Sequence, residues 1–283
     1  MSSLEKKIDF VGLITVNMAN PNGDPLNGNR PRTDYNGLGE ISDVCIKRKL
    51  RNRMQDLGHC IFVQSDENAD DGFKSLSERA SSILKGINDK DECAKVACEK
   101  WIDVRTFGQV FAFKAKDTAS IGIRGPVSIH QTISVNPVEV HSMQITKSVN
   151  GEPNSSGNKS SDTMGTKHYV KFGLYIIKGS INVQLAEKTG FSEMDSNVLK
   201  ECLMSLFTND ASSARPDGSM EMEKLYWFKH NCKDGQYSSA KVHRSVHVKL
   251  NPEIVSPNSI NDYTISLDRS EIKDLEVEVL TGK

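Results

Sequence analysis

The spacing of apolar residues predicts a strand followed by an amphipathic helix near the N-terminus. Residues 8–17 are largely apolar on both alternating faces, which is typical of a strand in the middle of a sheet. Residues 42–54 instead repeat apolar side chains at helical spacing, and Ser42 or Asp43 can cap the first turn. One stripe of this helix is suited to dock on a sheet and consists of Ile46, Leu50, Met54 and Leu57.

The remaining pattern predicts further strands and helices. Residues 58–103 are polar and helical, with amphipathic pieces at 73–87 and 91–101, and a helix capped by Ser192 covers 191–207. Strands are expected at 107–114, 121–135, 139–146, 167–178, 223–230 and 240–250. A Ser-, Asn- and Gly-rich stretch at 147–165 predicts a long mobile loop, and 209–220 a turn-rich one.

This order of elements predicts an α+β fold with helices on one face of a sheet. The ferredoxin-like or RNA-recognition-motif (RRM) layout is the commonest such arrangement that also binds RNA. The usual aromatic RNP signature of that motif is missing from the sequence. Any contact with RNA is therefore expected from loops and insertions.

Positive charge is concentrated in the first predicted helix and the loop before it. The whole chain has 36 Lys+Arg against 37 Asp+Glu in 283 residues, whereas residues 29–53 hold seven basic residues against three acidic ones. The basic ones are Arg30, Arg32, Lys47, Arg48, Lys49, Arg51 and Arg53. A solvated helix face is the simpler explanation, but the glycines of the preceding loop let backbone N–H groups approach a phosphate. We therefore favour a polyanion-binding surface.

The composition excludes several other classes of protein. No run of 18 apolar residues and no signal peptide is present, so we expect a soluble cytoplasmic protein. The six cysteines form no C-x-x-C pair, which indicates a reducing compartment and argues against a zinc knuckle. Neither a Walker loop nor a dinucleotide fingerprint occurs. The segments 64–95 and 253–283 are acidic, and we expect them to meet protein partners.

Catalytic and metal-binding chemistry is poorly supported. On the strand predicted at 240–250, His243 and His247 share a face but lie about 13 Å apart, too far to ligate one ion. No nucleophile elbow or Cys/His signature is present. Asp24, Asp34 and Asp43 can form a carboxylate cluster for a metal-dependent nuclease, but the arginines between them favour pairing with these acids or with phosphates. We therefore expect neither a metal nor a cofactor.

Two further features leave alternatives open. Alternation places Arg244 on the apolar face of the strand predicted at 240–250, so it either ends the strand at the sheet edge or reaches a phosphate or carboxylate. Met143 and Ile145 precede the Ser/Asn-rich stretch. They are core residues or, alternatively, wedges that insert between bases.

Several motifs together resemble the backbone subunit of type I CRISPR interference complexes, a member of the RAMP superfamily. They include Asn-Pro-Asn-Gly-Asp-Pro at 20–25, Gly-Asn-Arg-Pro-Arg-Thr-Asp at 28–34 and Asp-Val-Arg-Thr-Phe-Gly at 103–108. The motifs at 160–165, 209–220 and 236–244 look like the I-C subtype of the Cascade complex. The resemblance covers most of the chain and is weakest at 60–100 and after residue 252.

The resemblance implies a single domain with a modified RRM or ferredoxin-like palm, a helical finger insertion and a β-hairpin thumb. The palm corresponds to about 1–57, 105–133 and 168–250, the finger to 58–104, the thumb to 134–167 and a C-terminal extension to 251–283. Several copies are expected to polymerise along one CRISPR RNA, leaving short guide segments free to pair with target DNA. The other expected partners are the guide-end cap, the large subunit and a recruited helicase-nuclease, which does the cutting.

The resemblance also assigns RNA-binding residues. Those matching guide-backbone contacts of the family are Arg32, Lys47, Arg48 and Arg51. Those lying where the family packs against a displaced nucleotide are Phe107, Gln109 and Val110. Those on the thumb are Met143, Ile145, Lys147 and Ser148. The remaining residues expected at the RNA are Asn20, Asn22, Arg30, Ser42, Arg105, Lys167, His168, Arg215, Lys241 and Arg244.

The function implied is that of a non-catalytic RNA-binding filament subunit. Base pairing supplies the specificity, so the protein needs phosphate and 2′-hydroxyl contacts rather than base readout. A metal-dependent endoribonuclease of the same superfamily is the alternative, since type III relatives cleave RNA with a loop aspartate. A general RNA chaperone, which binds without forming assemblies of defined length, is the third hypothesis.

Overall fold

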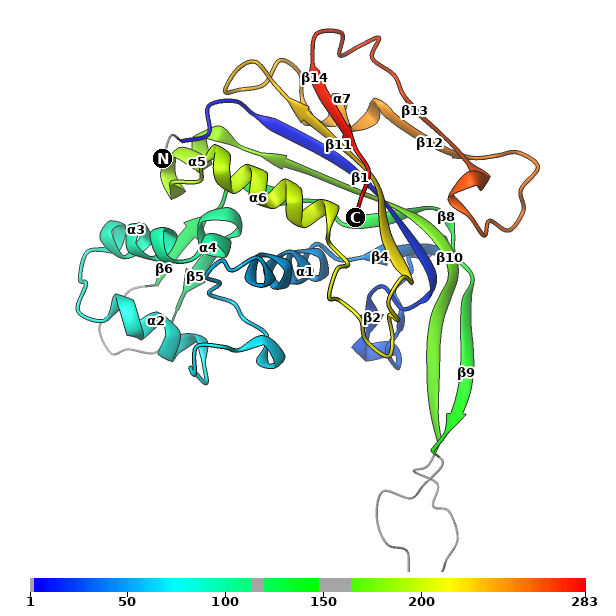
Figure 1. Cartoon of the computed structure of the whole chain (residues 1–283), viewed down its shortest axis with the longest axis horizontal. Helices are drawn as coiled ribbons and strands as arrows, with labels where there is room; N and C mark the ends of the chain where they lie inside the picture. The colour runs from blue at the N-terminus through cyan, green and yellow to red at the C-terminus, as the bar shows by residue number, and fades with distance from the viewer. Residues whose placement is uncertain (1–2, 113–119, 148–163) are drawn as a thin grey trace, which may run out of the picture.

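The computed structural model describes residues 3–112, 120–147 and 164–283, and Figure 1 shows its arrangement. A twisted antiparallel sheet runs across the molecule, with helices below it in this view and a long hairpin projecting from one end. The described part of the sheet has eight strands, with β14-β11-β1-β10-β8-β4 in order and β7 and β9 paired to β10 off this path. Mixed α and β structure around a central sheet is therefore confirmed.

Two long strands form the centre of the sheet. β1 (Ile8–Ala19) pairs antiparallel with β10 (Met164–Ile181) from Ile8 opposite Ile181 to Ala19 opposite Val170. On its other side β1 pairs with β11 (Met220–Lys229), with a register shift between Leu13 and Ile14. The first nine residues of β1 are buried, because both faces of the sheet are covered here.

Shorter strands complete this sheet. Its remaining members are β4 (Leu38–Ile41), β7 (Val127–Ile129), β8 (Thr132–Pro137), β9 (Val140–Thr146) and β14 (Glu276–Leu280). Three two-stranded ladders lie outside it, formed by β2 (Gly23–Asp24) with β3 (Arg30–Pro31), β5 (Gly108–Phe111) with β6 (Ile121–Arg124), and β12 (Val246–Leu250) with β13 (Tyr263–Leu267). β9 pairs with the N-terminal half of β10, and this β9–β10 hairpin projects away from the body (Figure 1).

Helices and short strands cover the two faces of the sheet. The helices are α1 (Asp43–Asp56), α2 (Leu76–Leu84), α3 (Lys90–Lys100), α4 (Ile102–Phe107), α5 (Val183–Thr189), α6 (Glu193–Met204) and α7 (Ser239–Arg244). Ile46, Leu50 and Met54 of α1 share one core with Leu199 and Leu203 of α6 and with the sheet. A second core holds α7, β12 and β13 against Val11 and Leu13 of β1, which point to the opposite face.

The segment between α1 and β6 has a core of its own. Phe62 lies with its ring centroid 4.7 Å from that of Trp101 and 5.0 Å from that of Phe111. Ala80 of α2 and Ala97 of α3 are buried against this aromatic cluster. In Figure 1 these helices form a lobe beside the main sheet. A separate core of this kind is what an inserted subdomain requires.

Many elements agree with the sequence prediction. The central strand, the α1 helix with its buried stripe, the Ser192 cap and the helical segment after α1 are all confirmed. The region 121–135 is broken into β6, β7 and the start of β8, and α5, β13 and β14 were missed. Met164 and Gly165 belong to β10 rather than to a loop. The rest of the predicted loop, at 148–163, lies outside the described residues, as does 113–119.

The strand predicted at 240–250 is wrong in its first half. Ser238 accepts a hydrogen bond from the N–H of Lys241 and caps α7, and the strand begins at Val246. His243 is buried on α7, with its Nε2 3.0 Å from the carbonyl oxygen of Gly179, so it does not share a strand face with His247. Arg244 is exposed at the end of α7, so its predicted place on the apolar face of a strand is wrong, whereas a contact with a phosphate stays a prediction. A six-residue helix shows too few turns for its period to stand out from alternation.

Among the described residues, no helix has the length and the apolar run that crossing a bilayer requires.

Gly179 provides a test of the central packing. A Cβ at this position would lie 2.1 Å from Cζ of Phe10, a fully buried ring that stacks on Trp227. We expect Gly179→Ala to lower the free energy of unfolding by about 1–3 kcal/mol, because the core has to shift to admit the methyl group. Urea unfolding measures this change. Gly122→Ala is the control, since a Cβ there meets nothing within 4 Å; an equal loss in both variants would contradict the explanation.

Candidate nucleic-acid interface

The loop at 20–32 is tied to the start of α1. The side-chain oxygen of Asn22 accepts a hydrogen bond of 2.9 Å from the N–H of Ser42, the residue that caps α1. The N–H of Arg32 donates to the carbonyl oxygen of Asn22 at 3.0 Å. Asn20 is buried, and its amide donates to the carbonyl oxygen of Asn29 at 2.7 Å. We call Asn20, Asn22, Arg30, Arg32 and Ser42 the loop–helix cluster, and the structure brings all five of these predicted residues together.

Arg30 joins this cluster to the base of the projecting hairpin. Its guanidinium lies 2.7 Å from the hydroxyl of Ser142 in β9 and 3.4 Å from Nδ1 of His168 in β10. Ser142 and His168 are directly opposite each other in the β9–β10 ladder, and the Ser142 hydroxyl oxygen lies 2.9 Å from Nδ1 of His168. Segments far apart in the sequence therefore meet at one point, and two of the residues predicted to bind RNA, Arg30 and His168, are in contact there.

Arg32 of the cluster and Lys47, which lies next to it on α1, are only partly neutralised. Arg32 lies 3.5 Å from Asp24 and its side chain is 38% exposed. Lys47 pairs with Asp43 one turn earlier on α1, at 2.9 Å, and both groups reach solvent. Such surface pairs are weak, so an incoming phosphate can compete with the acid for the cation. Arg32 and Lys47 therefore remain good candidates for phosphate contacts.

Other basic residues of α1 have internal roles. Arg51 donates from Nε to the fully buried Asp103 at 2.9 Å, and its guanidinium carbon lies 5.1 Å from the ring centroid of Phe107. Asp103 also accepts from the N–H groups of Phe62 and Val63. Arg48 donates to the carbonyl oxygen of Val63 at 2.6 Å, and burial lowers its pKa. These side chains attach the α2–α3 lobe to α1.

Lys49 and Arg215 show a similar internal arrangement on the other side of α1. Lys49 is buried and pairs with Asp210, and burial lowers its pKa although Asp210 opposes the shift. Arg215 lies 3.2 Å from the same Asp210. The main chain of this loop reaches the cluster, since the N–H of Asn20 donates to the carbonyl oxygen of Ala214. Arg215 therefore lies next to the predicted site, and its charge is partly neutralised by Asp210.

The residues predicted around α4 and β5 form a second group. Arg105 pairs with Asp195 of α6 at 2.8 Å and donates to the carbonyl oxygen of Cys98, so it also holds the lobe in place. Phe107 is half-buried against Arg51. The amide of Gln109 donates to the carbonyl oxygen of Val110, whose side chain is exposed. Val110 is thus an apolar side chain open to a ligand.

The projecting hairpin exposes apolar side chains. Met143 and Ile145 are 49% and 47% exposed, so the alternative that they are core residues is wrong. Met164, opposite Thr146, is exposed as well. Lys167 lies opposite Met143, and Lys147 directly follows β9. Ser148 lies outside the described residues.

Lys241 and Arg244 do not join the other predicted residues. Both are on α7, which packs with the core on the opposite face of the sheet from α1. Lys241 lies 3.8 Å from Glu271 and over the ring of Tyr237. They therefore lie apart from the residues of α1, because a helix turns the chain where a strand was expected, and their contact with RNA stays a prediction.

Comparison with known proteins places this geometry in a family. The family described as "CRISPR-associated protein Cas7" matches residues 6–268. The chain belongs to the Cas7 family. A CRISPR-associated protein Cas7 from Haloferax volcanii is 29% identical over 217 residues, covering 69% of this chain. The alignment covers 62% of that relative, so the chain spans under two thirds of its length.

A solved structure shares the fold. A chain of a "CRISPR RNA-guided surveillance complex, pre-nicking" superposes with a TM-score of 0.53 and 15% sequence identity. The superposition covers 84% of the present chain and 81% of the chain from the solved complex. At this identity the likeness establishes the arrangement of the sheet and helices, and the roles of single residues rest on the contacts described above.

Sequence reasoning missed several residues of the interface in this Cas7-family chain. Ser142 bonds both Arg30 and His168, yet its place depends on the register of β9 against β10, which no local pattern encodes. Asp103 and Asp195 were also missed as the partners of Arg51 and Arg105. Among the described residues, no three His, Cys, Asp or Glu side chains gather as a metal site would need.

The Arg51–Asp103 pair can be tested by stability. We expect Asp103→Ala in this Cas7-family chain to lower the free energy of unfolding by about 3–5 kcal/mol, because a half-buried guanidinium and two N–H groups lose their partner. Urea unfolding followed by circular dichroism measures it. The control Glu99→Ala removes an exposed acid 4.0 Å from Lys95 and should cost less than about 0.5 kcal/mol. A small loss for Asp103→Ala would mean that Arg51 is free to bind elsewhere.

Proposed function

We propose that this chain is a CRISPR RNA-binding backbone subunit that repeats along the guide RNA and presents it for pairing with target DNA. The observation that carries the proposal is the junction at Arg30, where the loop–helix cluster meets the base of the projecting hairpin. Cations and amides at the junction suit phosphates, while the exposed apolar side chains farther along the hairpin suit bases. Membership of the Cas7 family supports the same role.

The architecture is consistent with a palm, finger and thumb. The strand order β11-β1-β10-β8, with α1 and α6 on one face, supports the proposal of a ferredoxin-like or RRM palm. The lobe around Phe62 and Trp101 is the finger in this proposal, and the β9–β10 hairpin is the thumb. β10 runs without a break from thumb to palm, so thumb and palm share one strand.

Grip on the RNA is proposed to be independent of sequence. Arg30, Arg32 and Lys47 are the cations placed to meet phosphates, and Asn20 and Asn22 fix the loop that carries two of them. Arg48, Arg51 and Arg105 act through position, since they hold the finger against the palm. Phosphate contacts fix register and orientation without reading bases, and the guide supplies the specificity.

The thumb is proposed to displace nucleotides. Met143 and Ile145 alternate along β9 and so share one face of the hairpin, both about half exposed. An exposed apolar face on a projecting element can insert between bases at a modest unstacking cost. Val110 of β5 is a further exposed apolar contact for a displaced nucleotide.

The partners follow from this role. We propose contacts with CRISPR RNA, other copies of the chain, the guide-end cap and the large subunit, in the I-C subtype of Cascade in the cytoplasm. Cutting is assigned to a recruited helicase-nuclease, so the chain itself is not an enzyme in this proposal. The relative from Haloferax volcanii supports the family but extends beyond the matched region.

The phosphate contacts can be tested by salt dependence. We expect Arg32→Ala with Lys47→Ala to weaken guide RNA binding about equally for different spacer sequences. The slope of log affinity against log salt should become shallower by roughly one to two units. The reason is that a protein with fewer phosphate contacts releases fewer counterions when it binds. Fluorescence anisotropy with two unrelated labelled guides at several salt concentrations measures both quantities.

A matched variant and a size measurement complete this test. Lys95→Ala with Lys249→Ala removes two exposed cations from other surfaces and should leave the slope unchanged. An unchanged slope in the Arg32/Lys47 variant would show that these two side chains do not contact the RNA. Light scattering with guides of two lengths should give particles whose mass follows guide length; one constant mass would favour the RNA chaperone instead.

The nuclease alternative rests on the three N-terminal aspartates, and each of them has internal partners. Asp24 caps a short turn at Leu26 and pairs with Arg32. Asp34 accepts from the N–H groups of Asn36 and Leu38, each at 2.8 Å. Asp43 pairs with Lys47. These contacts give each carboxylate a structural role, which favours the non-catalytic hypothesis.

Cleavage assays separate the two hypotheses. We expect the assembly to leave labelled complementary RNA intact in the presence of Mg²⁺. The three carboxylates accept hydrogen bonds from turns or pair with Arg32 and Lys47, so they are not arranged to bind a metal ion. Denaturing gel electrophoresis of the target strand shows the outcome. Cuts at regular intervals that disappear in Asp24→Ala or Asp34→Ala would establish the ribonuclease.

A further inference from the structure

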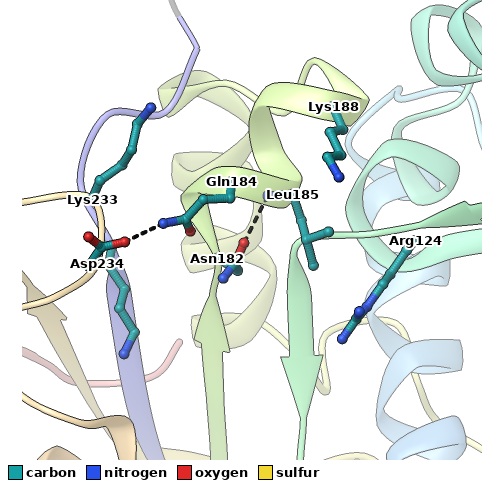
Figure 2. A pocket seen from close by; sticks show the side chains of 8 residues that line it. Arg124, Asn182, Gln184, Leu185, Lys188, Lys233 and Asp234 are labelled. Carbon is teal, nitrogen blue, oxygen red and sulfur yellow. Dashed lines mark hydrogen bonds between the residues drawn. The ribbon is translucent and has the colours of Figure 1, made fainter.

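A basic hollow lies at the end of the sheet where β1 begins. It has a volume of about 430 Å³ and is lined by Lys7, Arg124, Lys188 and Lys233 together with Asn182, Gln184, Leu185 and Asp234. Figure 2 shows Arg124 and Lys188 on one side of it, with Lys233 and Asp234 on the other. Four cations from four different segments thus converge on one concave surface.

A second hollow of about 420 Å³ adjoins the first. The two share Lys7, Arg124, Asn182 and Leu185 as lining residues, so they form one trough. The second part adds hydrogen-bonding groups rather than charge, namely Ser128, His130, Ser180 and Ser239. The trough therefore has a cationic part and a hydroxyl-rich part, and each volume falls in the range of ligand sites.

Two of the cations are left without a counter-charge. Lys7 lies 3.6 Å from the buried Asp9, and Lys233 pairs with Glu187. Asp234 accepts a hydrogen bond from Gln184, as Figure 2 shows. The side chains of Arg124 and Lys188 make no ion pair or hydrogen bond within the described part of the chain. The trough thus keeps a positive field that an anion would neutralise.

The trough is remote from the loop–helix cluster. Lys7 directly precedes β1, whereas Asn20 directly follows it, and β1 has 12 residues. At about 3.3 Å per residue the two ends lie roughly 40 Å apart. One phosphate group cannot contact both surfaces, so the trough needs a ligand or ligand segment of its own.

We propose that this trough binds a second stretch of nucleic-acid backbone, as single-stranded phosphodiester. Arg124 and Lys188 would take phosphate oxygens. The exposed Ser128 would bond a phosphate or ribose oxygen further along the strand, whereas Ser180 and Ser239 hydrogen-bond the buried Asp9. A protein partner fits less well, because the lining residues include no Trp, Tyr, Phe or Met anchor of the kind that concentrates binding energy in protein interfaces. The same lack of aromatic platforms predicts binding without base preference.

The proposal does not depend on the guide-binding role, so it is tested on the free protein. The probes are fluorescein-labelled 20-nucleotide oligouridylate and oligothymidylate, with anisotropy read between 50 and 200 mM salt. Arg124→Ala with Lys188→Ala should weaken binding about five- to tenfold and lower the salt slope by about one unit. The conservative pair Arg124→Lys with Lys188→Arg should restore most of the affinity, and Lys95→Ala with Lys249→Ala should change neither quantity.

Combination with the cluster variant separates the two surfaces. Because they lie far apart, the losses from Arg124/Lys188 and Arg32/Lys47 should multiply in the quadruple variant. A quadruple variant no weaker than Arg32/Lys47 alone would overturn the proposal even if the cluster binds RNA. Conversely, losses confined to Arg124/Lys188 would support the trough and contradict the guide-binding cluster.

The two probes identify the source of the strand. Equal losses for RNA and DNA support contacts with phosphates alone, and a loss for RNA only supports an additional contact with the ribose 2′-hydroxyl. Unchanged affinity for both probes in a variant with a normal thermal unfolding curve would overturn the proposal. A change in the mass of the free protein by light scattering, with strand binding intact, would show instead that the trough contacts another copy of the chain.

Discussion

The antiparallel pairing of β1 with β10 is the constraint on which the rest of the structure depends. It runs from Ile8 opposite Ile181 to Ala19 opposite Val170, and β10 continues beyond it into the projecting hairpin. The direction of the hairpin and its distance from α1 are therefore set by a strand that is locked in the core. The buried residues of β1 make a register slip costly, because a slip by one residue would exchange its two faces.

Ion pairs between elements divide the basic residues into two kinds. Arg51 with Asp103, Arg105 with Asp195 and Lys49 with Asp210 are pairs in which at least one partner is buried, and they join α1, α4 and α6 to neighbouring segments. Arg32 and Lys47 pair with partly exposed acids and keep access to solvent. The near-neutral total charge therefore includes two kinds of cation: those paired inside the structure and those that remain available to a ligand.

The two candidate anion surfaces lie at opposite ends of β1. The loop–helix cluster follows the strand, and the trough lined by Arg124 and Lys188 lies at its start. One rigid strand therefore fixes the distance between them. In a repeating assembly such a spacing would hold two stretches of nucleic acid in parallel positions on every copy, or one long strand at two points.

The sequence by itself determined the central strand, the α1 stripe, the Ser192 cap and the basic character of the first helix, because these depend on local period and capping chemistry. It predicted a strand where the structure has α7 at Ser239–Arg244, because six residues are too few for a helical period to stand out. Which cations keep access to solvent was decided only by the tertiary structure. Arg51 and Lys47 look equivalent in the sequence, but Arg51 pairs with the buried Asp103, whereas Lys47 stays at the surface beside Asp43. The partners of Arg30 and the trough around Arg124 were likewise decided by packing, because strand register and long-range contacts bring them together across most of the chain.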